Sequence, residues 1–185
     1  KGIMITHGHE DHIGSIAYLL RNVNAPVFGT RLSLGLIEQK LKEHGILSVA
    51  KLNRVTAGDN VKISKNFTVE FIRVNHSISD AVGMAIKTPV GTVVHTGDFK
   101  IDCTPIEGSM IDLAKFGELG KKGVLALMSD STNVERAGYT MSERTVGEKF
   151  ETIFKGTRSR IFVATFASNV DRVQQIINAA VRNRR

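Results

Sequence analysis

The chain has 185 residues, enough for one domain with a proper core or for one domain and part of another. Its 25 basic and 18 acidic residues give a net charge of +7, which favours a polyanionic partner without naming one. No run approaches the roughly 18 consecutive apolar residues of a membrane helix. A single cysteine, Cys103, excludes an internal disulfide. We therefore expect a cytoplasmic protein without membrane association, in which Cys103 is a small buried thiol.

The first motif follows a short apolar run near the N-terminus. Residues 3–5 predict a buried strand, and the chain continues with Thr-His-Gly-His-Glu-Asp-His-Ile-Gly. In an extended segment His7 and His9 point to the same side, while Asp11 and His12 fall where the chain turns. Imidazole and carboxylate ligands suit zinc or manganese, and two ligand pairs on one short loop suit two adjacent ions. A solvated, His-rich loop is the alternative, but it gives no reason for the position directly after a strand.

Helical and strand patterns fill the rest of the chain. The expected helices lie at residues 12–23, 30–44, 142–154 and 169–181. The expected strands lie at residues 50–55, 67–74, 82–88, 92–96, 124–128 and 160–165. The last two are continuous apolar runs, which predicts that they are buried, on both faces in the case of 124–128.

Two later strands end in further candidate ligands. His76 follows the strand at 67–74, and Asp98 follows Gly97, which lets the backbone turn sharply and leaves the carboxylate at the strand edge. A metal site draws ligands from several segments, so we expect both side chains to join the first motif. His95 is close in sequence, but strand alternation argues against ligation, and we expect a hydrogen-bonded core histidine.

Together these motifs resemble the metallo-β-lactamase fold and, within it, the ribonuclease J group of β-CASP nucleases. The His-x-His-x-Asp-His string is the signature of the fold. The stretches that resemble the ribonuclease J group are His76–Asp80, Thr96–Asp102, Ser129–Asn133 and Ala164–Val170. The resemblance implies an α/β fold, namely an incomplete αββα sandwich followed by the start of an inserted β-CASP domain.

The resemblance also implies how the chain is divided. Residues 1–141 would form part of the lactamase domain, and 142–185 the linker helix with the first strand and helix of the β-CASP domain. Because the chain begins at the strand of the metal motif, we expect a fragment of a longer enzyme that is inactive by itself. In the last helix, Val173, Ile176 and Ile177 should then be more exposed than their spacing suggests.

Roles for the site residues follow from the resemblance as well. The implied ligands are His7, His9 and His76 for one zinc ion, Asp11 and His12 for a second, and Asp98 as the bridge. Manganese is the alternative metal. Asp11 and Asp98 would be the catalytic carboxylates. Asp130 would support a ligand histidine by accepting its proton, although a turn or cap carboxylate accounts for this residue equally well.

The implied function is a zinc-dependent ribonuclease that hydrolyses RNA phosphodiester bonds, from the 5′ end and internally, in RNA processing and decay. Its partner would be single-stranded RNA, and the full-length form would be a homo-oligomer or part of a complex with other RNA-processing proteins. The alternative is a hydrolase of the same fold that acts on a small ester or amide. A third interpretation, a non-catalytic scaffold, is disfavoured because degraded relatives typically lose ligands.

Overall fold

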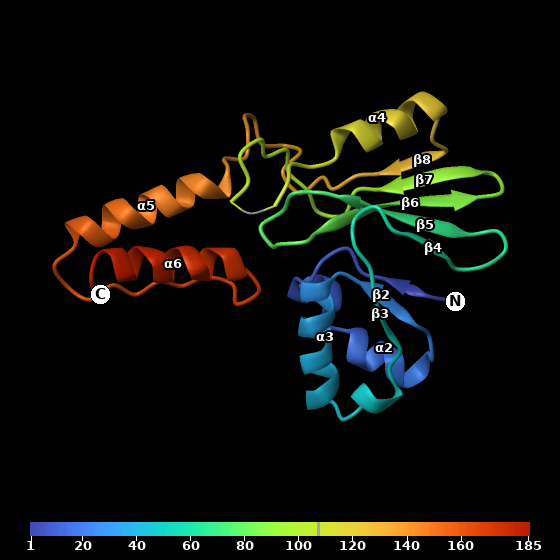
Figure 1. Ribbon diagram of the computed structural model, residues 1–185, viewed down its shortest axis with the longest axis horizontal. Coiled ribbons are helices and arrows are strands. Elements are labelled where there is room, and N and C mark those ends of the chain that lie inside the picture. Colours follow the sequence, from blue (N-terminus) through green and yellow to red (C-terminus); the bar gives the residue numbers. More distant parts are fainter. Residues whose placement is uncertain (107) are drawn as a thin grey trace.

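The computed structural model describes residues 1–106 and 108–185, which form two sheets flanked by helices (Figure 1). The smaller sheet is parallel, in the order β1 (Ile3–Met4), β2 (Val27–Gly29) and β3 (Leu52–Arg54). The larger sheet has five strands in sequence order: β4 (Asn60–Lys62), β5 (Thr68–Arg73), β6 (Val82–Thr88), β7 (Gly91–His95) and β8 (Ala126–Met128). Its pairs are antiparallel except β7 with β8, which are parallel.

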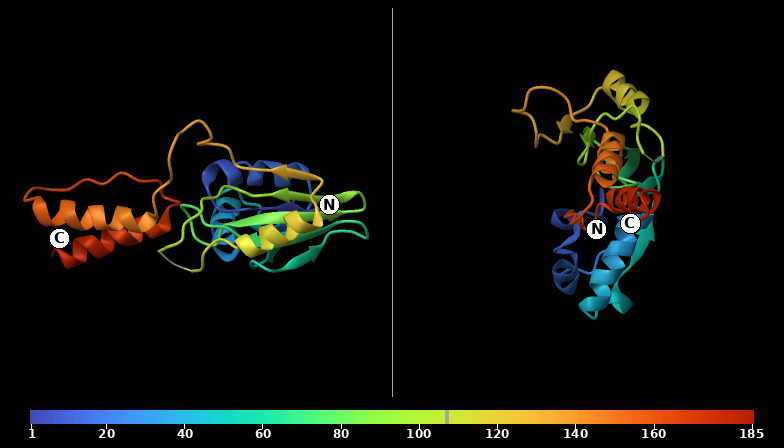
Figure 2. Two further views of the ribbon diagram at one scale, coloured as in Figure 1. Left: turned by 90° about the horizontal axis from the view of Figure 1, so that it is seen from above. Right: turned by 90° about the vertical axis from the view of Figure 1, so that its left-hand side faces the viewer.

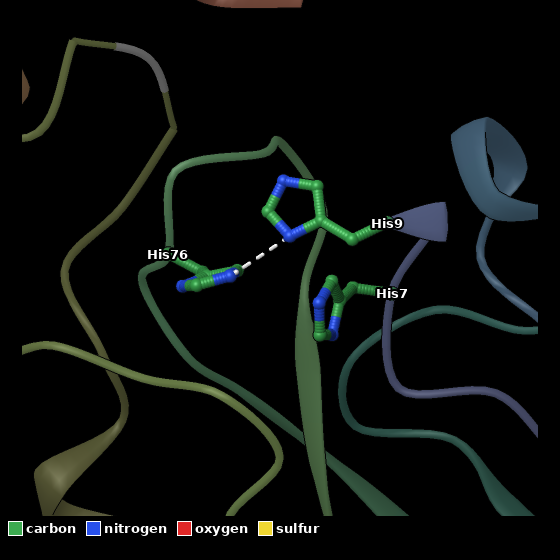
Figure 3. Close-up of side chains that lie close together, drawn as sticks. All are labelled: His7, His9 and His76. Atoms are coloured by element: carbon green, nitrogen blue, oxygen red, sulfur yellow. Dashed lines mark hydrogen bonds between the residues drawn. The ribbon is translucent and has the colours of Figure 1, made fainter. Parts of the chain in front are cut away.

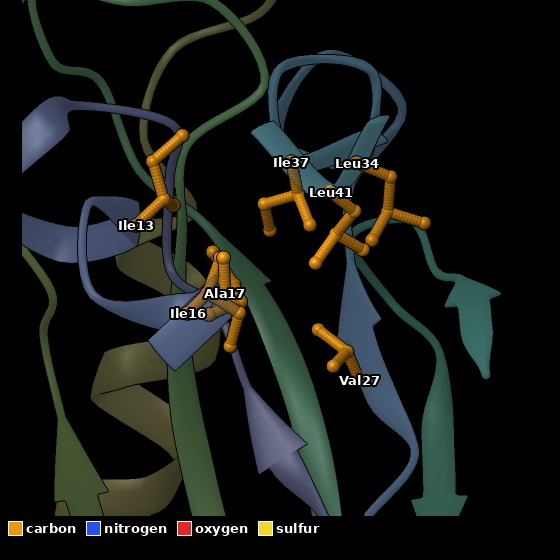
Figure 4. Packing of buried hydrophobic residues seen from close by; sticks show 8 residues of the cluster. Ile13, Ile16, Ala17, Val27, Leu34, Ile37 and Leu41 are labelled. Atoms are coloured by element: carbon orange, nitrogen blue, oxygen red, sulfur yellow. The ribbon is translucent and has the colours of Figure 1, made fainter. Parts of the chain in front are cut away.

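Helices cover the outer faces of both sheets. The helices on the smaller sheet are α1 (Glu10–Ile13), α2 (Ile16–Asn22) and α3 (Arg31–Glu43), with a 3-10 turn at Leu47–Val49. The helix α4 (Leu113–Lys122) lies on the larger sheet. Figure 4 shows the hydrophobic core between the smaller sheet and its helices, in which Ile16, Ile37 and Leu41 pack with Val27 of β2.

Period-two alternation along β5 explains how the layers join. Val69 and Phe71 face the smaller sheet and pack with Phe28, whereas Ile72 faces the other way, toward Leu119 of α4. All but Phe28 are buried. The arrangement is therefore helix, sheet, sheet, helix, which confirms the α/β sandwich expected from the sequence motifs.

The last two helices form an arm beside the sandwich. Figures 1 and 2 show α5 (Glu143–Gly156) and α6 (Val170–Arg182) lying side by side and projecting from one end of it. Ser142 caps α5 and Asn169 caps α6, each through its side-chain oxygen. Of the three α6 residues expected to be exposed, Val173 and Ile177 are 36% and 49% exposed, whereas Ile176 is partly buried. Every helix in the described residues is too short or too polar to cross a membrane.

Several expectations about local structure are wrong. The first helix begins at Glu10 and breaks after Ile13, instead of running from residue 12 to 23. Cys103 is exposed. The strands β2 and β4 lie in segments with no expected strand, because each has only three residues and shows no readable alternation.

The two apolar runs near the C-terminus are not buried strands. In the run at 124–128, only β8 is a strand and all five residues are exposed, since β8 pairs with β7 alone and forms the sheet edge. Residues 160–165 pair with no strand among the described residues, and Phe162 is 91% exposed. An apolar run indicates that a segment tends to be extended and buried. It does not show whether a neighbouring strand is available to pair with that segment.

Glu70 offers a test of the packing between α4 and the larger sheet. Its carboxylate is buried and accepts hydrogen bonds from Lys115 of α4 and from Lys87, the latter at 2.8 Å. Burial raises the pKa of the Glu70 carboxyl, but the two lysines outweigh it and hold the pKa below the ordinary 4.5.

We predict that Glu70→Gln lowers the free energy of unfolding by about 1–2 kcal/mol at pH 7, a range that allows for the partial exposure of the lysines. Because the pKa in the folded state is depressed, this stabilisation is present above pH 4.5 and is lost as the pH falls below it. Urea unfolding across this pH range measures the difference. Glu118→Gln, at an exposed carboxylate 3.8 Å from Lys115, is the control and should change little.

Candidate metal centre

Four histidines and one aspartate from separate elements converge at one edge of the sandwich. His7 follows β1, His9 precedes α1, and His12 lies within α1. His76 follows β5 and Asp98 follows β7. Figure 3 shows three of these rings, His7, His9 and His76, turned toward one another.

His7 lies at the centre of the cluster. It is fully buried, and its Nδ1 lies 3.1 Å from the Thr6 hydroxyl. Its Nε2 has no hydrogen-bond partner among the described residues. A buried polar atom without a partner costs about 1–3 kcal/mol, so this nitrogen is suited to a ligand that the protein alone does not supply. With Nδ1–H donating to Thr6, the Nε2 lone pair is free to bind a metal ion.

The first candidate group is His7, His9 and His76, whose ligand nitrogens lie within 4.8 Å of one another. His9 Nδ1 and His76 Nε2 are 3.1 Å apart. Two nitrogens bound to one tetrahedral zinc ion, each at about 2.0–2.1 Å, lie about 3.3 Å apart. The three histidines therefore fit a single ion.

The second candidate group is His7, His12 and Asp98. Oδ2 of Asp98 lies 3.4 Å from Nε2 of His12 and 3.9 Å from Nε2 of His7. It also lies 3.7 Å from Nε2 of His76, which belongs to the first group. One carboxylate oxygen thus lies within 3.9 Å of histidine nitrogens from both groups.

Local backbone geometry aims the Asp98 carboxylate. Gly97 has φ +61°, and a Cβ at this position would come 2.9 Å from the carbonyl oxygen of Val82. Its N–H donates to Nδ1 of His95 at 3.0 Å. His95 therefore shapes the turn through a hydrogen bond, and it belongs to neither candidate metal group.

Asp11 and Asp130 belong to neither candidate group. The Asp11 side chain is 79% exposed, 3.5 Å from Nε2 of His12, and lies outside both groups. Asp130 accepts from the N–H and hydroxyl of Thr132 at 2.9 and 2.7 Å, and its own N–H donates to Thr96. Its contacts are those of a turn carboxylate, without a hydrogen bond to any described histidine, although its charge acts on the pKa values of His7 and His76.

Two further residues support the site, and the sequence motifs did not reveal the first of them. Thr6 orients the His7 ring, and its only sequence signal is its position directly before the motif. Asp80, with φ +55°, accepts from the Thr30 hydroxyl at 2.8 Å and from the Leu32 N–H at 3.0 Å. The loop that carries His76 is thereby tied to the start of α3.

Burial favours the neutral form of three of the imidazoles, those of His7, His9 and His76. It lowers the pKa of His7 to about 2, with repulsion from His12, His76 and His9 adding to the shift. Burial also lowers the pKa of His9 and of His76. A neutral imidazole is the form that binds a metal ion, so the electrostatics agree with the geometry.

The cluster opens into a cavity of about 560 Å³. One side of it is lined by the first motif together with His76, Ser77 and Asp98. The other side is formed by Phe166, Ser168 and Asn169, which lead into α6. The cavity thus lies between the sandwich and the arm.

Residues 1–114 match the family model of the β-lactamase superfamily domain. The match covers more than half of the chain, and the chain belongs to this superfamily. Among solved structures, a protein of unknown function from Enterococcus faecalis V583 shares the fold with a TM-score of 0.66 at 15% identity, over 96% of this chain and 44% of that one.

Among curated proteins, the chain is similar to ribonuclease J. It is 48% identical to ribonuclease J of Synechocystis sp. over 186 aligned positions, which cover 100% of this chain and 29% of that protein. It is 44% identical to ribonuclease J of Thermus thermophilus, over 97% of this chain and 32% of the relative. The resemblance inferred from the motifs is confirmed. The chain spans about a third of the length of these relatives.

We predict that the protein binds zinc and that His76→Ala weakens the binding at least 100-fold, since even the loss of a residue that only supports a ligand typically costs about 10–100-fold. Competition with a chromophoric chelator measures the affinity. The control is His44→Ala, at the end of α3, where the ring contacts Arg21 on the surface. Equal zinc affinity in the His76 variant and the unchanged protein would contradict the metal centre.

Proton linkage gives a second prediction. In the unfolded chain His7 titrates near 6.5, but in the folded metal-free protein only near 2, so between these values the unfolded state binds more protons. The free energy of unfolding should therefore fall as the pH drops below 6.5, with His7 contributing about 1.4 kcal/mol per pH unit. The slope should be shallower in His7→Gln and unchanged in His44→Gln. A pH-independent stability between pH 6.5 and 5 would contradict the burial of a neutral His7.

Proposed function

We propose that the chain is the metal-binding part of a zinc-dependent ribonuclease that hydrolyses RNA phosphodiester bonds. The observation that carries the proposal is the unpartnered Nε2 of the fully buried His7, at the centre of a cluster built from metal-binding side chains. The named relatives, ribonuclease J proteins at 44–48% identity, support RNA as the substrate. The net charge of +7 agrees with a polyanion.

The residues proposed to hold two zinc ions, or manganese in their place, are His7, His9 and His76 for one, His12 with Asp11 for the other, and Asp98 between them. Such ions, when bound, polarise a phosphoryl oxygen and make a water molecule acidic enough to attack at neutral pH. The Thr6 hydroxyl fixes the ring of His7, and the turn at Gly97 fixes the Asp98 carboxylate. Asp11 is exposed on the cavity wall, and its proposed role is to orient the attacking water and accept its proton.

The wider setting follows from the same proposal. The enzyme would act on single-stranded RNA, from the 5′ end and internally, in RNA processing and decay in the cytoplasm. It would work as a longer polypeptide, assembled as a homo-oligomer or with other RNA-processing proteins. A hydrolase of small esters or amides remains the competing function, and it would use the same metal centre.

The decisive variant is Asp98→Ala in the longest natural polypeptide that contains this chain. We predict that it abolishes RNA hydrolysis and leaves RNA affinity nearly unchanged, because the carboxylate positions the metal ions whereas affinity comes mainly from basic groups that contact phosphates. Hydrolysis of a labelled single-stranded RNA and filter binding at low salt measure the two effects. Glu118→Ala, at an exposed carboxylate of α4, is the control.

Two outcomes would contradict the proposal. Near-full turnover by the Asp98 variant with its metals restored would exclude the two-metal mechanism. An unaltered protein that hydrolyses a generic ester but neither binds nor cuts single-stranded RNA at low salt would favour the small-molecule hydrolase.

A further inference from the structure

The wall of the cavity opposite the histidines carries an exposed aromatic ring. Phe166 is 81% exposed and lines the same 560 Å³ cavity as His9, His76 and Asp98. Single exposed apolar residues are common on protein surfaces and carry no functional meaning by themselves. The position of this one does, because Phe166 lines the same cavity as the proposed catalytic residues.

Polar contacts at the start of α6 hold this wall in place. Asn169 is buried, and its side chain accepts from the Arg172 N–H at 3.1 Å. The Asp171 carboxylate accepts from the hydroxyl of Ser79, three residues after His76, with both oxygens at 2.8–2.9 Å. The segment that presents Phe166 is thus attached to the loop that presents a metal-binding histidine.

Salt bridges secure the same junction from the side of α5. Glu143 accepts from Arg172 of α6 at 2.5 Å and from Lys100 of the sandwich at 3.2 Å. Burial raises the pKa of Glu143, but the two cations outweigh it and hold the pKa of the carboxyl below its usual value. The arm and the sandwich therefore share a charged contact, which fixes Phe166 relative to the cluster.

The chemical groups on the two walls indicate which kind of molecule would fill the cavity. One wall offers metal-binding groups for a phosphate, and the other offers an aromatic plane. The volume lies within the range of small-molecule sites, roughly 300–1,000 Å³. A nucleotide, which joins a phosphate to a flat base, satisfies both walls at once.

We infer that Phe166 stacks on the base adjacent to the scissile phosphate. The inference rests on the proposed function and adds to it a base-binding role for Phe166. Stacking on a protein side chain requires a base that is splayed out of any duplex, so the site selects single-stranded RNA. Every base has an aromatic face, so the contact tolerates any sequence at this position.

The experiment compares two oligoribonucleotides in the full polypeptide loaded with zinc: one intact, and one lacking the base next to the scissile phosphate. For the intact substrate, Phe166→Ala should raise KM about tenfold and leave kcat unchanged, because stacking contributes equally to substrate and transition state. For the abasic substrate it should change nothing. Phe166→Tyr, which keeps a stacking ring, should restore the KM of the unaltered protein.

The chain provides a matched control in Phe162. This ring lies on the same segment and is 91% exposed, but it does not line the cavity. Phe162→Ala should leave KM unchanged for both oligonucleotides. An effect as large as that of Phe166→Ala would mean that general loss of surface apolarity, rather than stacking, causes the rise in KM, and would overturn the inference.

The remaining outcomes separate the inference from the proposed function. If the unaltered protein cuts both oligonucleotides with the same KM, or if Phe166→Ala affects both equally, the stacking role is wrong while the ribonuclease assignment stands. If the unaltered protein cuts neither oligonucleotide, the proposed function itself fails.

Discussion

The burial of one neutral imidazole, His7, is the constraint on which the rest of the site depends. Its ring centroid lies 4.0 Å from that of His12, 4.8 Å from His9 and 4.7 Å from His76. Four charged imidazoles this close would repel one another strongly, and a buried one would also lose its hydration. The buried His7 is therefore compatible with the fold only when its ring is neutral, and a neutral ring with a free nitrogen is what a cation binds.

The two-layer sandwich makes that burial possible. The strand β1 delivers His7 directly from the smaller sheet, while β5 and β7 of the larger sheet lead into His76 and Asp98. The packing of the sheets on each other brings these ends together. The arm then adds the second wall of the cavity through the Ser79–Asp171 and Lys100–Glu143 contacts. A chain similar to ribonuclease J thus combines a candidate metal centre with a second cavity wall that carries Phe166.

Those parts of the fold and of the site that depend on local sequence pattern were predictable from the sequence. The apolar spacing and the terminal residues of α3 and α6 identified both helices within a residue or two of their bounds. The hairpin of β6 and β7 followed from two β-branched runs around a turn. The His-x-His-x-Asp-His string predicted a metal site from its ligand side chains, and its resemblance to a family signature indicated the superfamily.

The tertiary structure alone decided which of these residues meet. Sequence could not show that Asp98 reaches both candidate groups while Asp11 lies outside them, since that depends on how two sheets pack. Nor could it show that β8 is an exposed edge, because pairing is a property of the neighbouring strand. Phe166 likewise gains its place opposite the histidines from contacts with residues far away in the chain. Local sequence determines periodicity and capping, whereas burial and proximity depend on distant partners.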